Sequence, residues 1–153
     1  MPEIDAKIRK TRRALKQIGY EAENVYAKEF HDYMTGEIFS EDPTTLSDVL
    51  GNDYLMVHEL AEMRELKKMG KIIDRRVIVD SPKTVIYEAH FAAMELELRY
   101  ALHRKDYYWA KLRLRQHEES VLDDDPNLPE ALRSRGEVIY AEFLKLTKNP
   151  LNH

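Results

Sequence analysis

The sequence predicts an all-α fold: a single-domain bundle of five or six helices joined by short loops. Apolar residues recur at spacings of three and four along nearly the whole chain, which is the period of an amphipathic helix. Glycine or proline interrupts this pattern where the helices are expected to end or begin. The chain of 153 residues is long enough for one domain with its own core. We expect that domain to span residues 1–153, with 145–153 as a loose tail.

The first half of the chain predicts three main helices. They cover about residues 4–18, 21–34 and 53–69. Ile4, Ile8 and Leu15 lie on a narrow apolar stripe of the first helix. The connector after the second helix has room for one more short helix behind Pro43.

The second half predicts three more helices. They cover about residues 82–103, 107–122 and 129–145. Ser81 before Pro82 is a helix start signal, with an N-cap followed by proline in the first turn. Residues 72–80 contain the β-branched run "RRVIVD", which fits either a loop or a short strand. Because a lone strand has no partner, we expect a loop there.

Composition excludes several classes of site. The chain has no cysteine, so it has no disulfide, zinc–thiolate site or cysteine nucleophile. The sequence has no run of about 18 apolar residues, so we expect a cytoplasmic protein that does not enter a membrane. Charged residues make up 34% of the chain, and only two glutamines occur. That composition is typical of thermophile proteins and suggests an archaeal source.

The stretch "HELAEMREL", residues 58–66, is the best candidate site. His58 and Glu62 are four residues apart, so their side chains are neighbours on one helical face and can share a divalent cation. Ligands from facing helices complete such sites in helix bundles. The candidate metal ligands are His31, His58, Glu59, Glu62 and His90. The alternative is an internal ion pair without a metal, which is the more common role of a histidine on an apolar face.

The same stretch resembles the second motif of HD-type phosphohydrolases, a His-Asp pair often followed by a glutamate. His58, Glu59 and Glu62 occupy those places, and Glu59 departs from the family's aspartate. The resemblance implies a bound divalent metal, with His31 as the upstream ligand. No downstream aspartate is clearly placed, and His90 is the substitute in this interpretation.

The stretch is also similar to the all-α nucleoside triphosphate pyrophosphohydrolases, whose paired glutamates bind magnesium. Glu59 and Glu62 match that pattern, and Glu88 falls at a suitable separation. Phe91 stands where the family has its last aspartate. Both resemblances imply a helical metal site that acts on a phosphoanhydride or phosphoester.

Residues 106–140 resemble a tetratricopeptide-like helical hairpin, with Ala110, Pro126 and Gly136 at repeat-like places. The sequence contains no second copy, although stable arrays need about three. A hairpin of this kind implies protein–protein interaction, and we expect a homodimer or another protein partner. The interface candidates are the consecutive aromatic residues Tyr107, Tyr108 and Trp109.

Six basic residues lie between positions 7 and 16, mostly away from the apolar stripe of the first helix. The net charge of the chain is −4, and no aromatic residues are interleaved with these cations. We therefore expect a solvated face, although a nucleic-acid contact through residues 7–16 stays open.

The sequence favours a non-catalytic interaction or assembly module, because each catalytic template lacks a ligand. The alternative is a divergent metal-dependent phosphohydrolase that acts on a nucleotide or related phosphoester. Whether the protein is an enzyme is left open. The two hypotheses differ in geometry, because the enzyme needs its histidines and glutamates to converge on one ion.

Overall fold

A computed structural model describes residues 1–40, 42–123 and 125–148. All regular structure within these ranges is helical, which confirms the all-α class. The expected number of helices is wrong: the described residues form eight α-helices and one π-helical segment. The two α-helices beyond the expected six are α3 and α5, which have only five and four residues. Helix α3 lies in the connector that had room for a short helix behind Pro43. Such short pieces leave too little periodicity to be recognised in a sequence.

The elements follow one another without strands in the described ranges. In chain order they are α1 (Pro2–Gln17), α2 (Ala27–Thr35), α3 (Leu46–Leu50), α4 (Asp53–Lys68), α5 (Val77–Asp80), α6 (Lys83–His103), α7 (Tyr107–His117), the π-helix η1 (Glu118–Asp123) and α8 (Glu130–Lys148). None of these helices is both long and apolar enough to cross a membrane.

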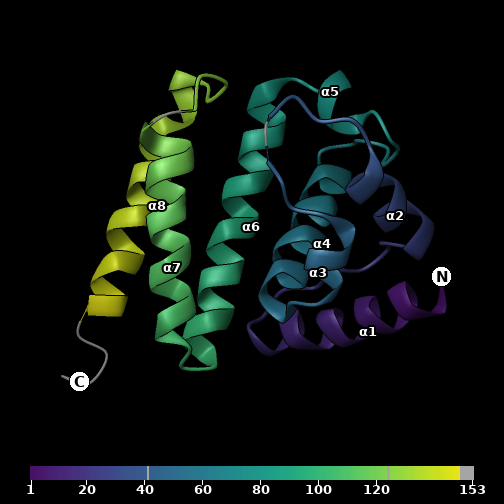
Figure 1. Cartoon of the computed structure of the whole chain (residues 1–153), viewed down its shortest axis with the longest axis horizontal. Helices are drawn as coiled ribbons and strands as arrows, with labels where there is room; N and C mark the ends of the chain where they lie inside the picture. Colours follow the sequence, from purple (N-terminus) through teal and green to yellow (C-terminus); the bar gives the residue numbers. More distant parts are fainter. Residues whose placement is uncertain (41, 124, 149–153) are drawn as a thin grey trace.

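Helices α4 and α6 form the central pair of the bundle, and each packs extensively against the other. Helices α1, α2 and α3 cover α4, while α7 and α8 pair with each other and lie against the opposite side of α6 (Figure 1). The sequence of α6 agrees with this central position, because eleven of its residues are buried. A helix that is apolar on two sides must have neighbours on both.

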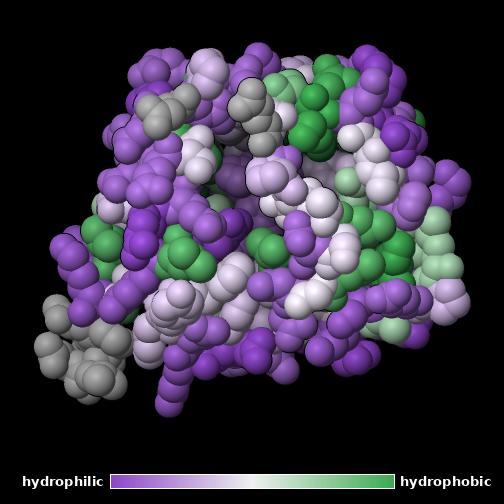
Figure 2. Space-filling view, viewed as in Figure 1, coloured by the Kyte–Doolittle hydropathy of each residue, from purple (hydrophilic) through white to green (hydrophobic). Residues whose placement is uncertain are grey.

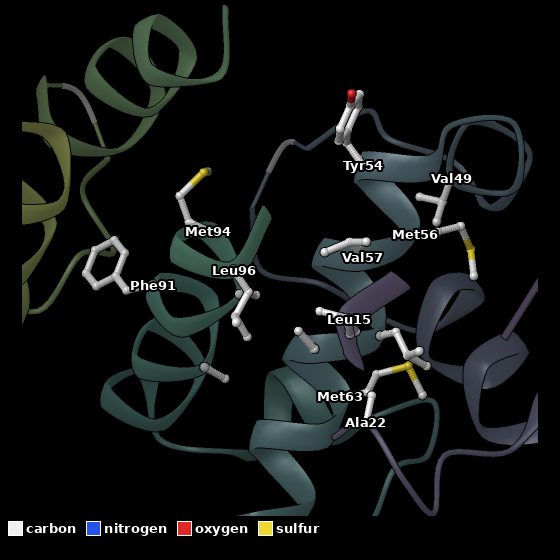
Figure 3. Close-up of a cluster of buried hydrophobic side chains, with 14 of the residues drawn as sticks. Leu15, Ala22, Val49, Tyr54, Met56, Val57, Met63, Phe91, Met94 and Leu96 are labelled. Carbon is white, nitrogen blue, oxygen red and sulfur yellow. The ribbon is translucent and has the colours of Figure 1, made fainter. Parts of the chain in front are cut away.

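The core extends across α6 rather than ending at it. Leu15 of α1, Met63 of α4 and Leu96 of α6 belong to the buried cluster on one side (Figure 3). Phe91 lies on the side of α6 that faces the α7–α8 hairpin, where it meets Gly136 of α8. The absence of a side chain at Gly136 lets the aromatic ring approach the backbone of α8.

The N-terminal half departs from expectation at the second helix. Helix α2 begins at Ala27 rather than near residue 21. Asn24 has a φ of 59°, a left-handed conformation that a continuing α-helix cannot contain. Tyr26, just before this helix, is 61% exposed, whereas Phe30 and Tyr33 within it are buried.

The C-terminal half departs at three places. Residues 72–80 contain the short helix α5, and α6 has Pro82 rather than Ser81 at its N-cap. The helix expected over 107–122 is α-helical only to His117, and the following residues form the π-helical segment η1. Residues 145–148 belong to α8, and Thr147 is fully buried, so the loose tail does not begin at residue 145. Residues 149–153 lie outside the described ranges.

A close backbone contact at Gly36 generates a stability prediction. A Cβ atom there would lie 2.5 Å from the Arg75 carbonyl oxygen and 2.8 Å from that of Asp32. We expect Gly36→Ala to lower the free energy of unfolding by about 1–3 kcal/mol, the usual effect of overpacking. Urea unfolding measures it. Gly51→Ala is the control, because its nearest neighbouring atom is at 3.4 Å. Equal losses in both variants would contradict the close contact.

Candidate functional site

A buried polar cluster joins α2, α4, α6 and α7 inside the core. Its centre is His58 of α4, which is 3% exposed, and Glu97 of α6, which is fully buried. Helical spacing places Glu62 one turn after His58 on the same face of α4. His90 lies about two turns before Glu97 on α6. The central packing of α4 against α6 therefore brings the four side chains together.

His58 is held from both sides. Its Nδ1 atom lies 2.9 Å from Oε1 of Glu97, and its Nε2 atom lies 3.1 Å from Oε2 of Glu62. When both ring nitrogens carry protons, each donates to one carboxylate. Two hydrogen bonds at opposite ends of the ring define its orientation between α4 and α6.

Glu97 is anchored by α7. Arg113 donates from Nε to Oε2 at 2.6 Å and from Nη2 to Oε1 at 3.0 Å. Trp109 donates its indole N–H to Oε2 at 2.7 Å. Bidentate pairs of this kind are short, directional and stronger than neutral hydrogen bonds. Glu97 therefore offers His58 a carboxylate whose position is set by a third helix.

Glu62 forms the outer end of the cluster. The hydroxyl of Tyr33 on α2 donates to its Oε1 atom, and Nδ1 of His90 lies 3.5 Å from its Oε2 atom. The His90 side chain is 26% exposed, so the cluster reaches the surface at this residue. Nε2 of His90 is nevertheless buried without a hydrogen-bond partner in the described structure. Figure 2 shows a recess in the molecular face over the middle of α6.

The charges of the buried groups compensate one another. Burial opposes the imidazolium form of His58, but its hydrogen bonds to Glu62 and Glu97 raise its pKa to about 10. Burial favours the neutral form of Glu97, but the Arg113 charge and the His58 hydrogen bond lower its pKa to about 2. Burial acts in the same way on Glu62, and hydrogen bonds to His58 and His90 outweigh it, so its pKa lies well below the ordinary value. Two cations then face two anions.

Glu59 is different from its neighbours. Burial and the adjacent charge of Glu62 raise the pKa of Glu59 to about 8, although the His58 charge acts in the opposite direction. This carboxyl group is therefore protonated at neutral pH when His58 and Glu62 are paired. A neutral acid beside a charged pair is a group that ionises when positive charge is added nearby.

The structure brings together three of the five predicted ligands. Ligand atoms of His58, Glu62 and His90 all lie within 4.8 Å of one another. Glu59 is beside this group but outside it. His31 is also outside it. The residue of α2 that faces Glu62 is Tyr33. Because two helical residues that are two positions apart point about 200° away from each other, His31 points away from Glu62.

The ligand set predicted from the sequence does not include the residues that support the site. Glu97 had a detectable signal, because it lies seven residues from His90 on one helical stripe. Tyr33 and Arg113 had none, because an inward tyrosine or a helical arginine is common. Within the chain, Trp109 stacks on Tyr54 with ring centroids 5.1 Å apart and donates its indole N–H to Glu97.

No family model matches the chain, and no curated protein or solved structure is significantly similar to it. The chemistry of the cluster therefore follows from its geometry. Two histidines and one glutamate are a ligand set of catalytic zinc sites, in which a fourth position stays open. Behind His58, Glu97 occupies the place of the outer carboxylate that orients a metal-binding histidine.

The shifted pKa values predict how metal-free stability depends on pH. The raised pKa of His58 contributes stability that is complete below about pH 6.5 and is lost as the pH rises towards 10. The lowered pKa of Glu97 contributes stability above about pH 4.5 that is lost as the pH falls towards 2. The raised pKa of Glu59 contributes a further loss of stability as the pH rises from about 4.5 to 8.

We expect stability in the presence of a chelator to be highest near pH 5–6. It should fall by more than about 1.4 kcal/mol, the equivalent of one pKa unit, between pH 6.5 and 10. Urea unfolding at fixed ionic strength measures this loss. His58→Gln should be less stable at pH 6 and show a smaller alkaline loss, whereas His103→Gln, at an exposed position, should match the wild type. An unchanged alkaline loss in His58→Gln would contradict the assignment.

Proposed function

We propose that this protein binds one divalent transition-metal ion through His58, Glu62 and His90. The observation that supports the proposal is the convergence of three ligand atoms within 4.8 Å, with a buried carboxylate behind the first histidine.

Glu97 prepares His58 for this role. A neutral His58 that donates from Nδ1 to Glu97 keeps Nε2 free as a ligand, on the side where Glu62 and His90 lie. Arg113 and Trp109 keep the carboxylate of Glu97 in place. Without an ion, the proton on Nε2 fills the same space and pairs with Glu62.

Charge balance supports exchange of protons for a metal. A divalent ion that displaces the Nε2 proton of His58 adds one positive charge to a network that was neutral. Ionisation of Glu59, whose pKa is raised to about 8 in the metal-free state, restores neutrality. Metal binding at pH 7 should therefore release two protons, one from His58 and one from Glu59.

The donor set favours certain ions and one reaction class. Two imidazole nitrogens and a carboxylate suit zinc, nickel or iron better than magnesium, calcium or manganese, which prefer oxygen ligands. A divalent ion with an open position acts as a Lewis acid and lowers the pKa of water. We propose hydrolysis of a small phosphoester, which agrees with the resemblance of "LMVHELAEM" to metal-dependent phosphohydrolases. Glu59, beside the ligands, is the candidate proton acceptor.

Calorimetry on the chelator-stripped protein tests the metal site. We expect one equivalent of zinc or nickel to bind, and titrations in buffers of different ionisation enthalpy to report about two protons released at pH 7. His90→Ala should weaken binding at least tenfold, and Glu97→Gln, which leaves all three ligands in place, about 10–100-fold. Glu59→Gln should retain binding but release one proton fewer.

His31→Ala is the matched control, since it removes a histidine outside the cluster. Equal weakening in His31→Ala and His90→Ala, or no saturable binding by the wild type, would overturn the metal site. Release of p-nitrophenol from a phosphodiester by the loaded protein tests the reaction class separately. Metal binding without hydrolysis would leave the site and remove the hydrolase assignment.

A second candidate function, assembly of two copies, has one favourable observation. Tyr108 is 79% exposed on α7, beside the half-buried Tyr107. Exposed tyrosines are enriched at protein interfaces, because the ring provides apolar area at low conformational cost. This arrangement supports a homodimer through the α7 surface, with Tyr108 at its centre.

Sedimentation velocity over a range of concentrations tests the dimer. We expect Tyr108→Glu to raise the dissociation constant at least tenfold, because it places a charge in an apolar contact. Tyr26→Glu is the matched control, at a tyrosine that is 61% exposed on a different element. A wild-type protein that stays monomeric at high concentration, or the same effect in both variants, would overturn the assignment.

A further inference from the structure

The second half of α1 and the segment after it form a groove of about 260 Å³. Arg9, Arg12, Arg13 and Lys16 line it from α1, and residues 20–23 line it from the other side. The groove lies outside the polar cluster, and its residues have no part in the proposed metal site. Its two walls carry opposite charge, because Glu21 and Glu23 belong to the second wall.

The turn at Gly19 builds this groove. Gly19 has a φ of 81°, and the amide of Tyr20 donates to the Leu15 carbonyl at 3.0 Å, the bond of a Schellman motif. The chain thereby reverses and runs back beside α1. The Tyr20 hydroxyl donates to Glu65 at 2.6 Å, and Ala22 is 2% exposed, so the second wall is fixed to the core.

The four basic side chains of the first wall are available for a ligand. All four are exposed, and none forms an ion pair with another group in the described ranges. By contrast, Lys10 on the neighbouring face pairs with Asp53. An unpaired basic row is notable in a chain whose net charge is −4.

The spacing of these four basic residues indicates a ligand with several linked anionic groups rather than a single anion. Positions 9, 12, 13 and 16 lie on one helical face, and the seven steps from the first to the last rise about 10 Å along the axis. A single phosphate cannot reach both ends of such a row. Successive phosphates of a nucleic acid strand can, and arginine matches their geometry with two hydrogen bonds.

The acidic wall distinguishes a nucleic acid strand from an acidic peptide. We propose that the groove binds single-stranded nucleic acid, with the phosphates against α1 and the base edges toward Glu21 and Glu23. Amino groups of the bases donate hydrogen bonds that carboxylates accept. An acidic peptide would bring its own carboxylates against the same two glutamates, which is repulsive.

Fluorescence anisotropy with a labelled 12-nucleotide single-stranded RNA of mixed sequence tests the proposal. The measurements include a chelator, so the result is independent of the metal site. We expect Arg12→Glu/Arg13→Glu to weaken binding at least tenfold. The slope of log K against log salt should become shallower by about 1.4, the value for two lost phosphate contacts on a single strand.

Lys111→Glu/Arg115→Glu on α7 is the matched control, because it changes the net charge equally at two exposed positions of another helix. It should weaken binding less than threefold. Circular dichroism during thermal unfolding verifies that each variant is folded, and Arg12→Ala/Arg13→Ala repeats the test without reversed charge. Glu21→Gln/Glu23→Gln should reduce the preference for RNA over polyglutamate.

Three results would overturn the assignment. The first is no binding by the wild type at low salt. The second is equal weakening by the groove and control variants, which would indicate a response to net charge alone. The third is polyglutamate binding as tight as RNA binding, which would assign the groove to an acidic protein partner.

Discussion

The buried carboxylate of Glu97 is the constraint on which the rest of the structure depends. A charged group with no exposed surface is costly unless it is paired and hydrogen-bonded. Its partners come from two different helices, His58 of α4 and Arg113 with Trp109 of α7. Satisfying one carboxylate therefore requires α4, α6 and α7 to meet in one relative arrangement.

This requirement gives the bundle its specificity more than its stability. Apolar faces on α6 can pack against neighbours in many rotations, because hydrophobic contact is not directional. The bidentate pair of Arg113 with Glu97 and the two hydrogen bonds of His58 form in far fewer of these rotations, because they are directional. One turn after Arg113 on α7, His117 contributes a similar restriction, since its Nε2 atom lies 3.0 Å from the Gly136 carbonyl oxygen and its ring packs against Phe91.

The same cluster contains a tension between stability and function. In the metal-free state the proton of His58 neutralises the carboxylates and stabilises the fold. In the proposed metal-bound state that proton leaves, and the ion takes over its electrostatic role. A protein that exchanges a proton for a divalent ion needs a nearby group that can change its charge. Glu59, whose pKa is raised, is such a group. In the proposed metal-bound state, the partly exposed His90 would be the ligand nearest to solvent.

The sequence by itself determined the all-α class and the position of most long helices. Periodicity sufficed there, because helices of sixteen residues or more repeat their apolar face several times. The same reasoning found His58, Glu62 and His90, since each is a polar residue on an otherwise apolar stripe. It failed for α5, which is too short to show a period, and for the start of α2, where Asn24 adopts a left-handed conformation. For α3 it indicated only that a short helix could follow Pro43.

Only the tertiary structure decided which polar residues meet. His31 and His90 are the same residue type in predicted helices, yet His90 lies against Glu62 and His31 does not. Tyr33 is 29 positions from Glu62, which it contacts, and Arg113 is 16 positions from Glu97. Local spacing defines neighbours within one helix but not the rotation of one helix against another. That rotation depends on packing and on the direction of a few buried hydrogen bonds.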